Sequence, residues 1–148
     1  MIKIRYILFI SIIAFSYITT IAQVRPKWIE QTPKQNNDYY YRVGIGKAQT
    51  QEDAEKKATA SIVYDSALAI GIAIDVSQLD SIVKKSSLAT VSKYYIIPIN
   101  IVCKHFEYKM DRDGKYYHYS YVLAQVAKRL TPEPVFKTFD CLEQKEIE

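Results

Sequence analysis

Two apolar segments joined by a tight turn constrain the fold of this chain more than any other feature. Residues 93–110 and 115–128 are rich in β-branched and aromatic side chains, which is typical of β-strands. Between them stands Asp111-Arg112-Asp113-Gly114, whose turn-forming residues predict a hairpin. A loop of two or four residues places odd-numbered positions of one strand opposite even-numbered positions of the other. The composition of each sheet face can therefore be predicted before the register is known.

This pairing divides the side chains of the hairpin between two faces. One predicted face is aliphatic, and we expect a helix to cover it; it holds Ile97, Ile99, Ile101, Cys103, Val122, Ala124 and Val126. The other is apolar but ringed with hydroxyl groups, and it holds Val102, Phe106, Tyr108, Tyr117, Tyr119, Tyr121 and Leu123. A solvent-facing sheet surface normally carries more charge. The sequence thus predicts an interaction surface made of Phe106, Tyr108, Tyr117, Tyr119 and Tyr121.

A strand and a helix precede the hairpin. Residues 39–48 alternate aromatic or β-branched side chains with smaller ones, which predicts a strand. Thr50 followed by Asp53 resembles a capping box and marks the start of a helix. An apolar stripe of Ala, Ile and Val side chains continues this helix over residues 54–70, and Gly71 is suited to end it.

Two glycines in the first strand allow two interpretations. Gly44 and Gly46 precede a helix, as in loops that bind nucleotides, but the third glycine of that motif is missing. The alternative is that they allow a helix to lie close against the strand. The sequence favours close packing.

The segments on either side of the hairpin are less regular. Residues 72–76 alternate like a strand, whereas residues 78–88 fit either a short helix or an irregular segment. Thr131-Pro132-Glu133-Pro134 ends the second strand. The apolar residues that follow have helical spacing and predict a short C-terminal tail helix; they are Val135, Phe136, Phe139 and Leu142.

The N-terminus has the pattern of an export signal. Lys3 and Arg5 precede an apolar stretch at residues 6–18, and the small residues that end at Ala22 suit a signal peptidase. We expect cleavage after Ala22. The alternative is an uncleaved membrane anchor, since the stretch approaches the roughly 20 apolar residues that span a bilayer. Cleavage lowers the formal charge of +4 by two, which is too little positive charge to indicate nucleic acid or an acidic membrane as a partner.

These patterns divide the chain into a signal peptide at residues 1–22, an extended leader at 23–38, one α+β domain at 39–130 and a C-terminal tail at 131–148. Trp28 is expected to bury its ring and hold the leader on the domain. The two cysteines, Cys103 and Cys141, face an oxidising compartment if the chain is exported. They are then either bridged or free thiols.

Three stretches together carry a family resemblance: Pro26-Lys27-Trp28-Ile29 with Pro33 before residues 39–48, the Ala-rich residues 52–58, and residues 119–126. They resemble the LPP-twenty lipoprotein family and the related N-terminal domain of flagellar assembly protein T. The resemblance implies a helix cradled by an antiparallel sheet in β-α-β-β order, a dodecin-like arrangement, at the envelope and without known catalytic activity. No lipid-bearing cysteine stands at the cleavage point, so we expect an unlipidated protein.

One set of side chains suggests a metal or a thiol–histidine site. Cys103, His105 and Glu107 share a predicted strand face, with His118 across the hairpin. A structural zinc site needs four ligands in a tetrahedral array, which residues strung along a hairpin do not readily form. The alternative, in which Cys103 is a small apolar residue buried beside Ala124, is therefore favoured. We expect no metal, no cofactor and no catalytic residue.

The sequence thus predicts a non-enzymatic bacterial envelope protein, a structural or interaction module that uses its tyrosine-rich sheet face. Tyrosine suits such a surface because it offers large contact area, little rotamer entropy and a hydroxyl group. The expected partner is another envelope protein or a second copy of the chain, with membrane contact only through an uncleaved signal segment. The alternative is a periplasmic small-ligand or glycan binding protein that uses the same face for stacking.

Overall fold

The computed structural model describes residues 24–71, 88–92, 95–129 and 136–147. The predictions for the signal peptide at residues 1–22 and for the strand at residues 72–76 lie outside the described residues, as does most of the segment at residues 78–88. Among the helices in the described ranges, none combines the length and the apolar character needed to cross a membrane.

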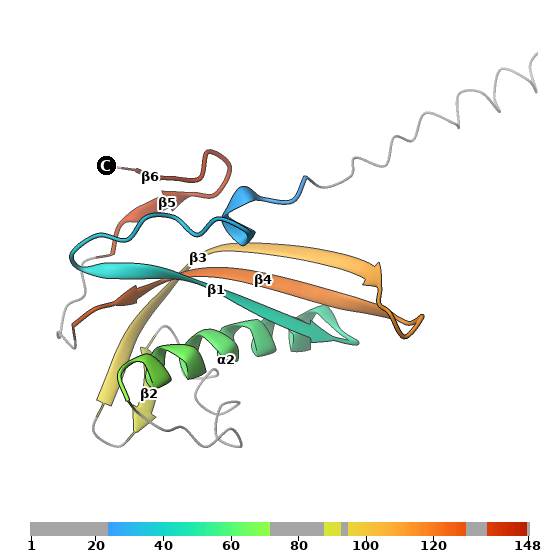
Figure 1. The fold of residues 1–148 in the computed structure, drawn as a ribbon, viewed down its shortest axis with the longest axis horizontal. Coiled ribbons are helices and arrows are strands. Elements are labelled where there is room, and N and C mark those ends of the chain that lie inside the picture. The colour runs from blue at the N-terminus through green and yellow to red at the C-terminus, as the bar shows by residue number, and fades with distance from the viewer. Residues whose placement is uncertain (1–23, 72–87, 93–94, 130–135, 148) are drawn as a thin grey trace, which may run out of the picture.

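The described chain is an α+β fold in which one helix packs on an antiparallel sheet (Figure 1). The sheet order is β1-β4-β3-β2, with strands β1 (Tyr39–Ala48), β2 (Leu88–Ser92), β3 (Tyr95–Met110) and β4 (Tyr116–Ala127). The helix is α2 (Gln51–Ala69), and the leader holds a short 3-10 turn, η1 (Lys27–Ile29). A second, two-stranded sheet consists of β5 (Thr138–Asp140) and β6 (Lys145–Ile147). The predicted α+β class, the first strand, the helix and the hairpin strands are confirmed.

Helix α2 begins and ends where the sequence predicts. The Thr50 hydroxyl accepts a hydrogen bond from the Asp53 backbone N–H at 3.1 Å, which satisfies one of the free donors of the first turn. The acidic side chains of Glu52 and Asp53 also lie near the positive end of the helix dipole. After Ala69 the chain leaves the helix through Gly71, whose φ of 78° is in the left-handed region that glycine adopts readily.

The glycines of β1 bring the helix backbone against the sheet. A Cβ atom on Gly44 would lie 2.0 Å from the carbonyl oxygen of Ala58, and one on Gly46 would lie 1.9 Å from that of Ala54. The prediction of close packing is confirmed. The core between α2 and the sheet consists of small and aliphatic side chains; it includes Ala58, Ile62, Val63, Ala67, Ile99, Val122, Ala124 and Val126.

The hairpin pairs differently from the prediction near its turn. Met110 lies opposite Tyr116, so the loop holds the five residues 111–115 and pairs odd positions with odd positions. Gly114 adopts a φ of 76° in this loop. Further along, a register shift between Ile101 and Cys103 leaves Val102 as the extra residue of a β-bulge. Beyond the bulge the pairing follows the predicted parity, with Ile101 opposite Ala124.

Because the loop has five residues, the side chains of β3 between the bulge and the turn lie on the faces opposite to those predicted. Phe106 and Tyr108 lie opposite Ser120 and His118, which are on the α2 side with Val122, so their predicted placement beside Tyr119 is wrong. The ion pair between Lys104 and Glu55 of α2 agrees with this orientation.

Cys103 also lies on the face opposite to the predicted one. It lies opposite Leu123 and packs on the sheet face away from α2, so the prediction that it lies beside Ala124 is wrong. Ile99, Val122, Ala124 and Val126 do form the aliphatic face under the helix, as predicted.

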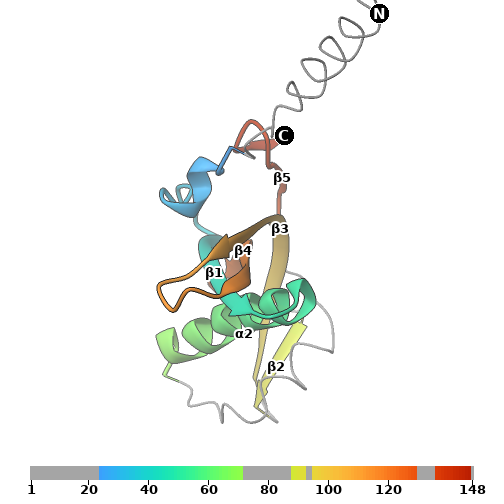
Figure 2. The same ribbon diagram turned by 90° about the vertical axis from the view of Figure 1, so that its right-hand side faces the viewer.

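The leader and the tail cover part of the sheet face opposite α2, as two perpendicular views show (Figures 1 and 2). Trp28 is 1% exposed and packs there, which confirms its predicted role. Tyr39, Tyr41 and Phe139 join it in a second apolar cluster. A disulfide bond joins Cys103 of β3 to Cys141 of the tail, with 5.7 Å between their Cα atoms. The tail is therefore bonded covalently to the sheet that it covers.

The predicted tail helix is wrong, because β5 and β6 form a small hairpin in its place. The carboxylate of Asp140 accepts hydrogen bonds from the backbone N–H groups of Leu142 and Glu143, and Gln144 has a φ of 57°. Such a side-chain cap and a left-handed residue favour a turn. Phe139 is buried on the sheet, whereas Leu142 is 92% exposed, so the helical spacing of these apolar residues was accidental.

Candidate functional site

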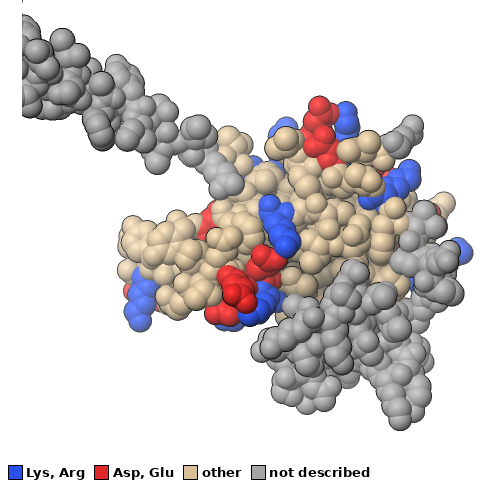
Figure 3. All heavy atoms as spheres, turned by 180° about the vertical axis from the view of Figure 1, so that it is seen from behind, with Lys and Arg blue, Asp and Glu red and all other residues tan. Residues whose placement is uncertain are grey.

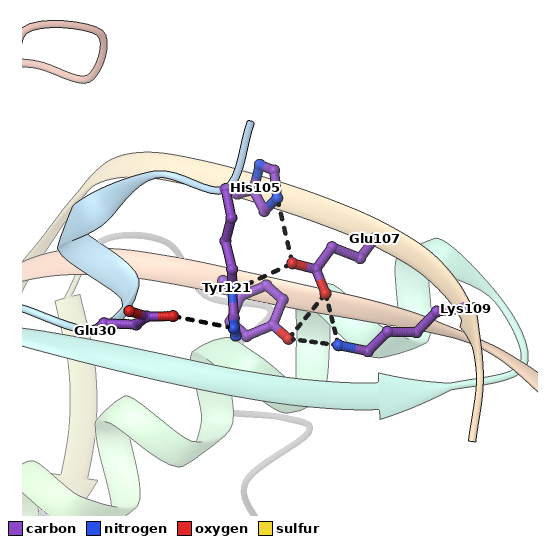
Figure 4. A network of polar contacts seen from close by, with 6 residues as sticks. Glu30, His105, Glu107, Lys109 and Tyr121 are labelled. Atoms are coloured by element: carbon purple, nitrogen blue, oxygen red, sulfur yellow. Dashed lines mark hydrogen bonds and ion pairs between the residues drawn. The ribbon is translucent and has the colours of Figure 1, made fainter. Parts of the chain in front are cut away.

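The leader closes over the middle of the sheet face opposite α2. The Arg25 guanidinium lies over the ring of Tyr121, 4.9 Å from its centroid, and its Nε is 3.3 Å from a carboxylate oxygen of Glu107. A second nitrogen of Arg25 is 3.4 Å from Glu30, also in the leader (Figure 4). Tyr121 is only 3% exposed as a result. This predicted interaction residue is therefore buried by the protein's own leader.

Glu107 is the centre of the polar network in Figure 4. Lys109 donates to its carboxylate at 2.6 Å, and the Tyr121 hydroxyl donates to the same oxygen at 3.2 Å. Burial raises the pKa of Glu107, but Lys109, Tyr121 and Arg25 outweigh it, and the net pKa lies below the ordinary value. The carboxylate is thus ionised at neutral pH and ties Arg25 of the leader to Lys109 of β3.

The residues of the candidate metal site do not converge. His105 is 4% exposed and its Nε2 is 3.5 Å from Glu107, without the geometry of a hydrogen bond. His118 points to the α2 side of the sheet, opposite Tyr108, and the sulfur of Cys103 is part of the disulfide. Within the part of the chain that the structure describes, no three His, Cys, Asp or Glu side chains are grouped to hold a metal ion.

Tyr117 and Tyr119 lie on the same face as Tyr121, nearer the hairpin turn, and both are half-buried. The ammonium group of Lys47 is 3.9 Å from the ring centroid of Tyr117 and forms an ion pair with Asp111. The Tyr117 hydroxyl donates to the Asp113 carboxylate at 2.7 Å. The ring and hydroxyl groups of this end of the face are therefore engaged by charged neighbours of the same molecule.

Among the described residues, the most exposed aromatic side chains lie on the other face of the hairpin, together with Met110. Tyr108 is 62% exposed, Met110 58% and Tyr116 52%. The rings of Tyr108 and Tyr116 stack with centroids 5.3 Å apart, and the Tyr108 ring is 4.6 Å from that of His118. Helix α2 begins at Gln51, after β1 has ended opposite His118, so the hairpin end beyond it is uncovered. We call Tyr108, Met110, Tyr116 and His118 the hairpin-end patch.

A view from behind shows an uncharged area at this end of the molecule, with charged side chains at its tip and along its border (Figure 3). The strand residues on that side alternate with charged residues that point to the opposite face, such as Lys109. Monomeric proteins seldom leave large contiguous apolar surfaces open, so an aromatic patch of this kind is a candidate binding surface.

The structure therefore divides the predicted interaction surface. Tyr108 lies in the hairpin-end patch, Phe106 is half-buried on the same side, and Tyr117, Tyr119 and Tyr121 lie on the opposite face. Sequence reasoning missed this patch, because the assumed loop length placed Tyr108 and Met110 of β3 on the face opposite to Tyr116 of β4. The five turn-forming and polar residues from Asp111 to Lys115 were the only signal that could have corrected this.

The ion pair at the hairpin turn predicts a pH response. The hydrogen bond from Lys47, followed by that from the Arg112 backbone N–H, lowers the pKa of Asp111 from 3.8 to about 2. Because the pKa is lower in the folded chain, this contact favours folding above pH 3.8 and loses its effect as the pH falls towards 2. In Lys47→Met we expect the Asp111 pKa, measured by NMR titration of the carboxyl carbon, to rise towards 3.8. An unchanged Asp111 titration would contradict the assignment, and Asp140, whose partners are backbone N–H groups, serves as the internal control.

No protein-family model, curated protein or solved structure matches this chain.

Proposed function

We propose that this protein is a non-enzymatic module of the bacterial envelope that binds a protein partner through its hairpin-end patch. The observation that carries the proposal is the exposure of three large side chains, Tyr108, Met110 and Tyr116, at a hairpin end that α2 leaves uncovered. Tyrosine and methionine are enriched where proteins bind one another, because they offer large and adaptable contact surfaces.

An envelope location is supported by the disulfide between Cys103 and Cys141. Bonds of this kind persist in the periplasm and outside the cell, and they are rare in the reducing cytosol. The export signal expected at residues 1–22 agrees with this location.

The proposal also includes the relationship to the LPP-twenty family and a dodecin-like arrangement. A single helix cradled by an antiparallel sheet is the arrangement that the resemblance implies, and the described fold is consistent with it. Members of that family carry a lipid at an N-terminal cysteine, which this chain lacks.

In vivo photo-crosslinking tests the proposed surface. A photoreactive amino acid at Tyr116 is expected to capture one specific envelope protein in living cells, and the same probe at Leu142 is not. Leu142 is a matched control because it is 92% exposed but lies in the tail, on the other side of the sheet. Adding Tyr108→Ser to the Tyr116 probe should reduce capture severalfold, since it removes the stacked ring. Equal capture from Leu142, or capture unaffected by Tyr108→Ser, would refute the proposal.

Glycan or small-ligand binding is the second candidate, and the stacked rings of Tyr108 and Tyr116 favour it. Flat exposed rings can stack against sugar rings or aromatic ligands. A thermal-shift screen with cell-wall fragments, other glycans and flavins checks this candidate. A ligand that stabilises the parent protein but not Tyr108→Ser would replace the protein-partner proposal.

A further inference from the structure

Strand β1 is the outermost strand of the sheet on one side. The backbone N–H of Lys128 donates to the carbonyl oxygen of Asp38 at 2.9 Å, so Asp38 directs its carbonyl group toward β4. Backbone groups alternate in direction along an antiparallel edge strand. The odd-numbered residues of β1 therefore direct their N–H and C=O groups away from the sheet.

Hydrogen bonds at both ends of β1 agree with this direction. They occupy outward backbone groups at each end of the edge. Asn36 caps Tyr39 twice: its side-chain oxygen accepts from the Tyr39 N–H at 3.0 Å, and its own N–H donates to the Tyr39 carbonyl oxygen at 3.2 Å. At the other end, the Lys57 ammonium group donates to the Lys47 carbonyl oxygen at 3.2 Å.

Among the described residues, none pairs with the middle of the edge. No hydrogen bond within the described ranges reaches the outward backbone groups of Tyr41, Val43 or Ile45. The side chain of Ile45 is 55% exposed, although the leader buries Tyr121, the residue opposite it on β4. A short stretch of free backbone donors and acceptors beside an exposed aliphatic side chain is suited to pairing with another strand.

The charges of α2 beside this edge indicate which strand fits. Lys57 lies next to Lys47 at one end of the open stretch. Asp65 lies next to Arg42 at the other end, with 3.9 Å between the carboxylate and guanidinium groups. These opposite charges flank the open stretch, and a two-fold axis through its centre brings each Lys57 near the Asp65 of a second copy.

We propose that two copies of this chain associate through the open edge of β1, antiparallel to one another, to form one continuous sheet. The outward backbone groups of Tyr41, Val43 and Ile45 pair with those of the second copy. In the dimer, side chains of the second copy on the same sheet face cover Ile45. The two Lys57–Asp65 contacts between the copies fix the antiparallel direction. An arbitrary extended peptide would supply the backbone bonds but not these charges, which is why a second copy fits this edge better.

Sedimentation equilibrium of the purified exported protein tests the backbone pairing. The parent protein is expected to be dimeric, and Val43→Pro is expected to weaken dimerisation by about tenfold or more, because it removes an outward N–H from each copy. The same variant keeps the β1–β4 bonds, since the Val43 N–H is not directed toward β4. Val43→Thr retains the N–H and a β-branched side chain, and it should weaken the dimer by no more than about threefold. A parent protein that is monomeric at every concentration, or a folded Val43→Pro that dimerises normally, overturns the proposal.

A charge-exchange experiment identifies the second copy without a backbone change. Lys57→Glu alone and Asp65→Lys alone each place like charges together twice in a homodimer, and both are expected to weaken it by a few fold. When the two variants are mixed, both contacts become attractive in the heterodimer. Native mass spectrometry should therefore show the mixed dimer in excess over either homodimer. A statistical mixture of the three dimers would overturn the antiparallel arrangement.

Discussion

Gly46→Ala is expected to destabilise the fold by about 3 kcal/mol or more, and it is among the most damaging single substitutions that the structure predicts. The added Cβ would lie 1.9 Å from the carbonyl oxygen of Ala54 and 2.5 Å from the backbone nitrogen of Ala58. Both atoms belong to the backbone of α2, so a side-chain rotation does not relieve the overlap. The helix has to move away from the sheet and loosen the core around Val122. Urea denaturation followed by circular dichroism measures the loss.

Gly114→Ala is the matched control for this substitution. Gly114 has a φ of 76° but no atom within 4 Å of an added Cβ, so only the left-handed backbone opposes alanine there. That strain is expected to cost about 1 kcal/mol. If the two variants lose equal stability, close approach of α2 is not the reason why glycine is needed in β1.

Reduction of the Cys103–Cys141 disulfide is expected to lower the free energy of unfolding by about 4 kcal/mol. The bond closes a loop with a sequence separation of 38 residues, and its loss gives the unfolded chain the conformational freedom that the loop removed. The urea midpoint of the parent protein should therefore fall when a reductant is added. The effect is large compared with the total stability of small domains, which is commonly about 5–15 kcal/mol.

The double variant Cys103→Ala/Cys141→Ala supplies the control for the reductant itself. Its midpoint should lie near that of the reduced parent protein, and it should not respond to reductant at all. We also expect limited proteolysis to cut the tail sooner in this variant, because only noncovalent contacts then hold the tail on the sheet. They include the hydrogen bonds of Gln144, Glu146 and the Lys137 carbonyl group and the packing of Phe136 and Phe139. A parent protein with the same midpoint in both redox states would contradict the predicted contribution.

Local sequence patterns were sufficient to predict β1, α2 and the two hairpin strands. The Thr50 cap, the glycines of β1 and the turn at residues 111–114 are short-range signals whose physical causes lie within a few residues. The assignment of faces depended instead on an exact loop length and on an unbroken ladder. An unexpected fifth loop residue and the bulge at Val102 each shift the parity of β3 by one, so the prediction failed between the two irregularities and held beyond them.

The candidate site was harder to predict because long-range packing determines which aromatic residues remain open. Tyr121 looks like its neighbours Tyr117 and Tyr119 in the sequence, but Arg25, almost a hundred residues earlier, lies over its ring. The tail is a similar case. Helical spacing over a few residues carried less information than Asp140, whose side chain closes the turn between β5 and β6.

The disulfide has a mechanical consequence when the chain is pulled by its two ends. Strand β4 and the hairpin turn lie inside the covalent loop between Cys103 and Cys141, so a force applied at the two ends of the chain bypasses them. With the bond intact, a fully stretched chain is shorter by the contour of the loop, which is about 130 Å. Pulling would peel away β1, α2 and the leader, while the sulfur bridge transmits the load directly from β3 to the tail.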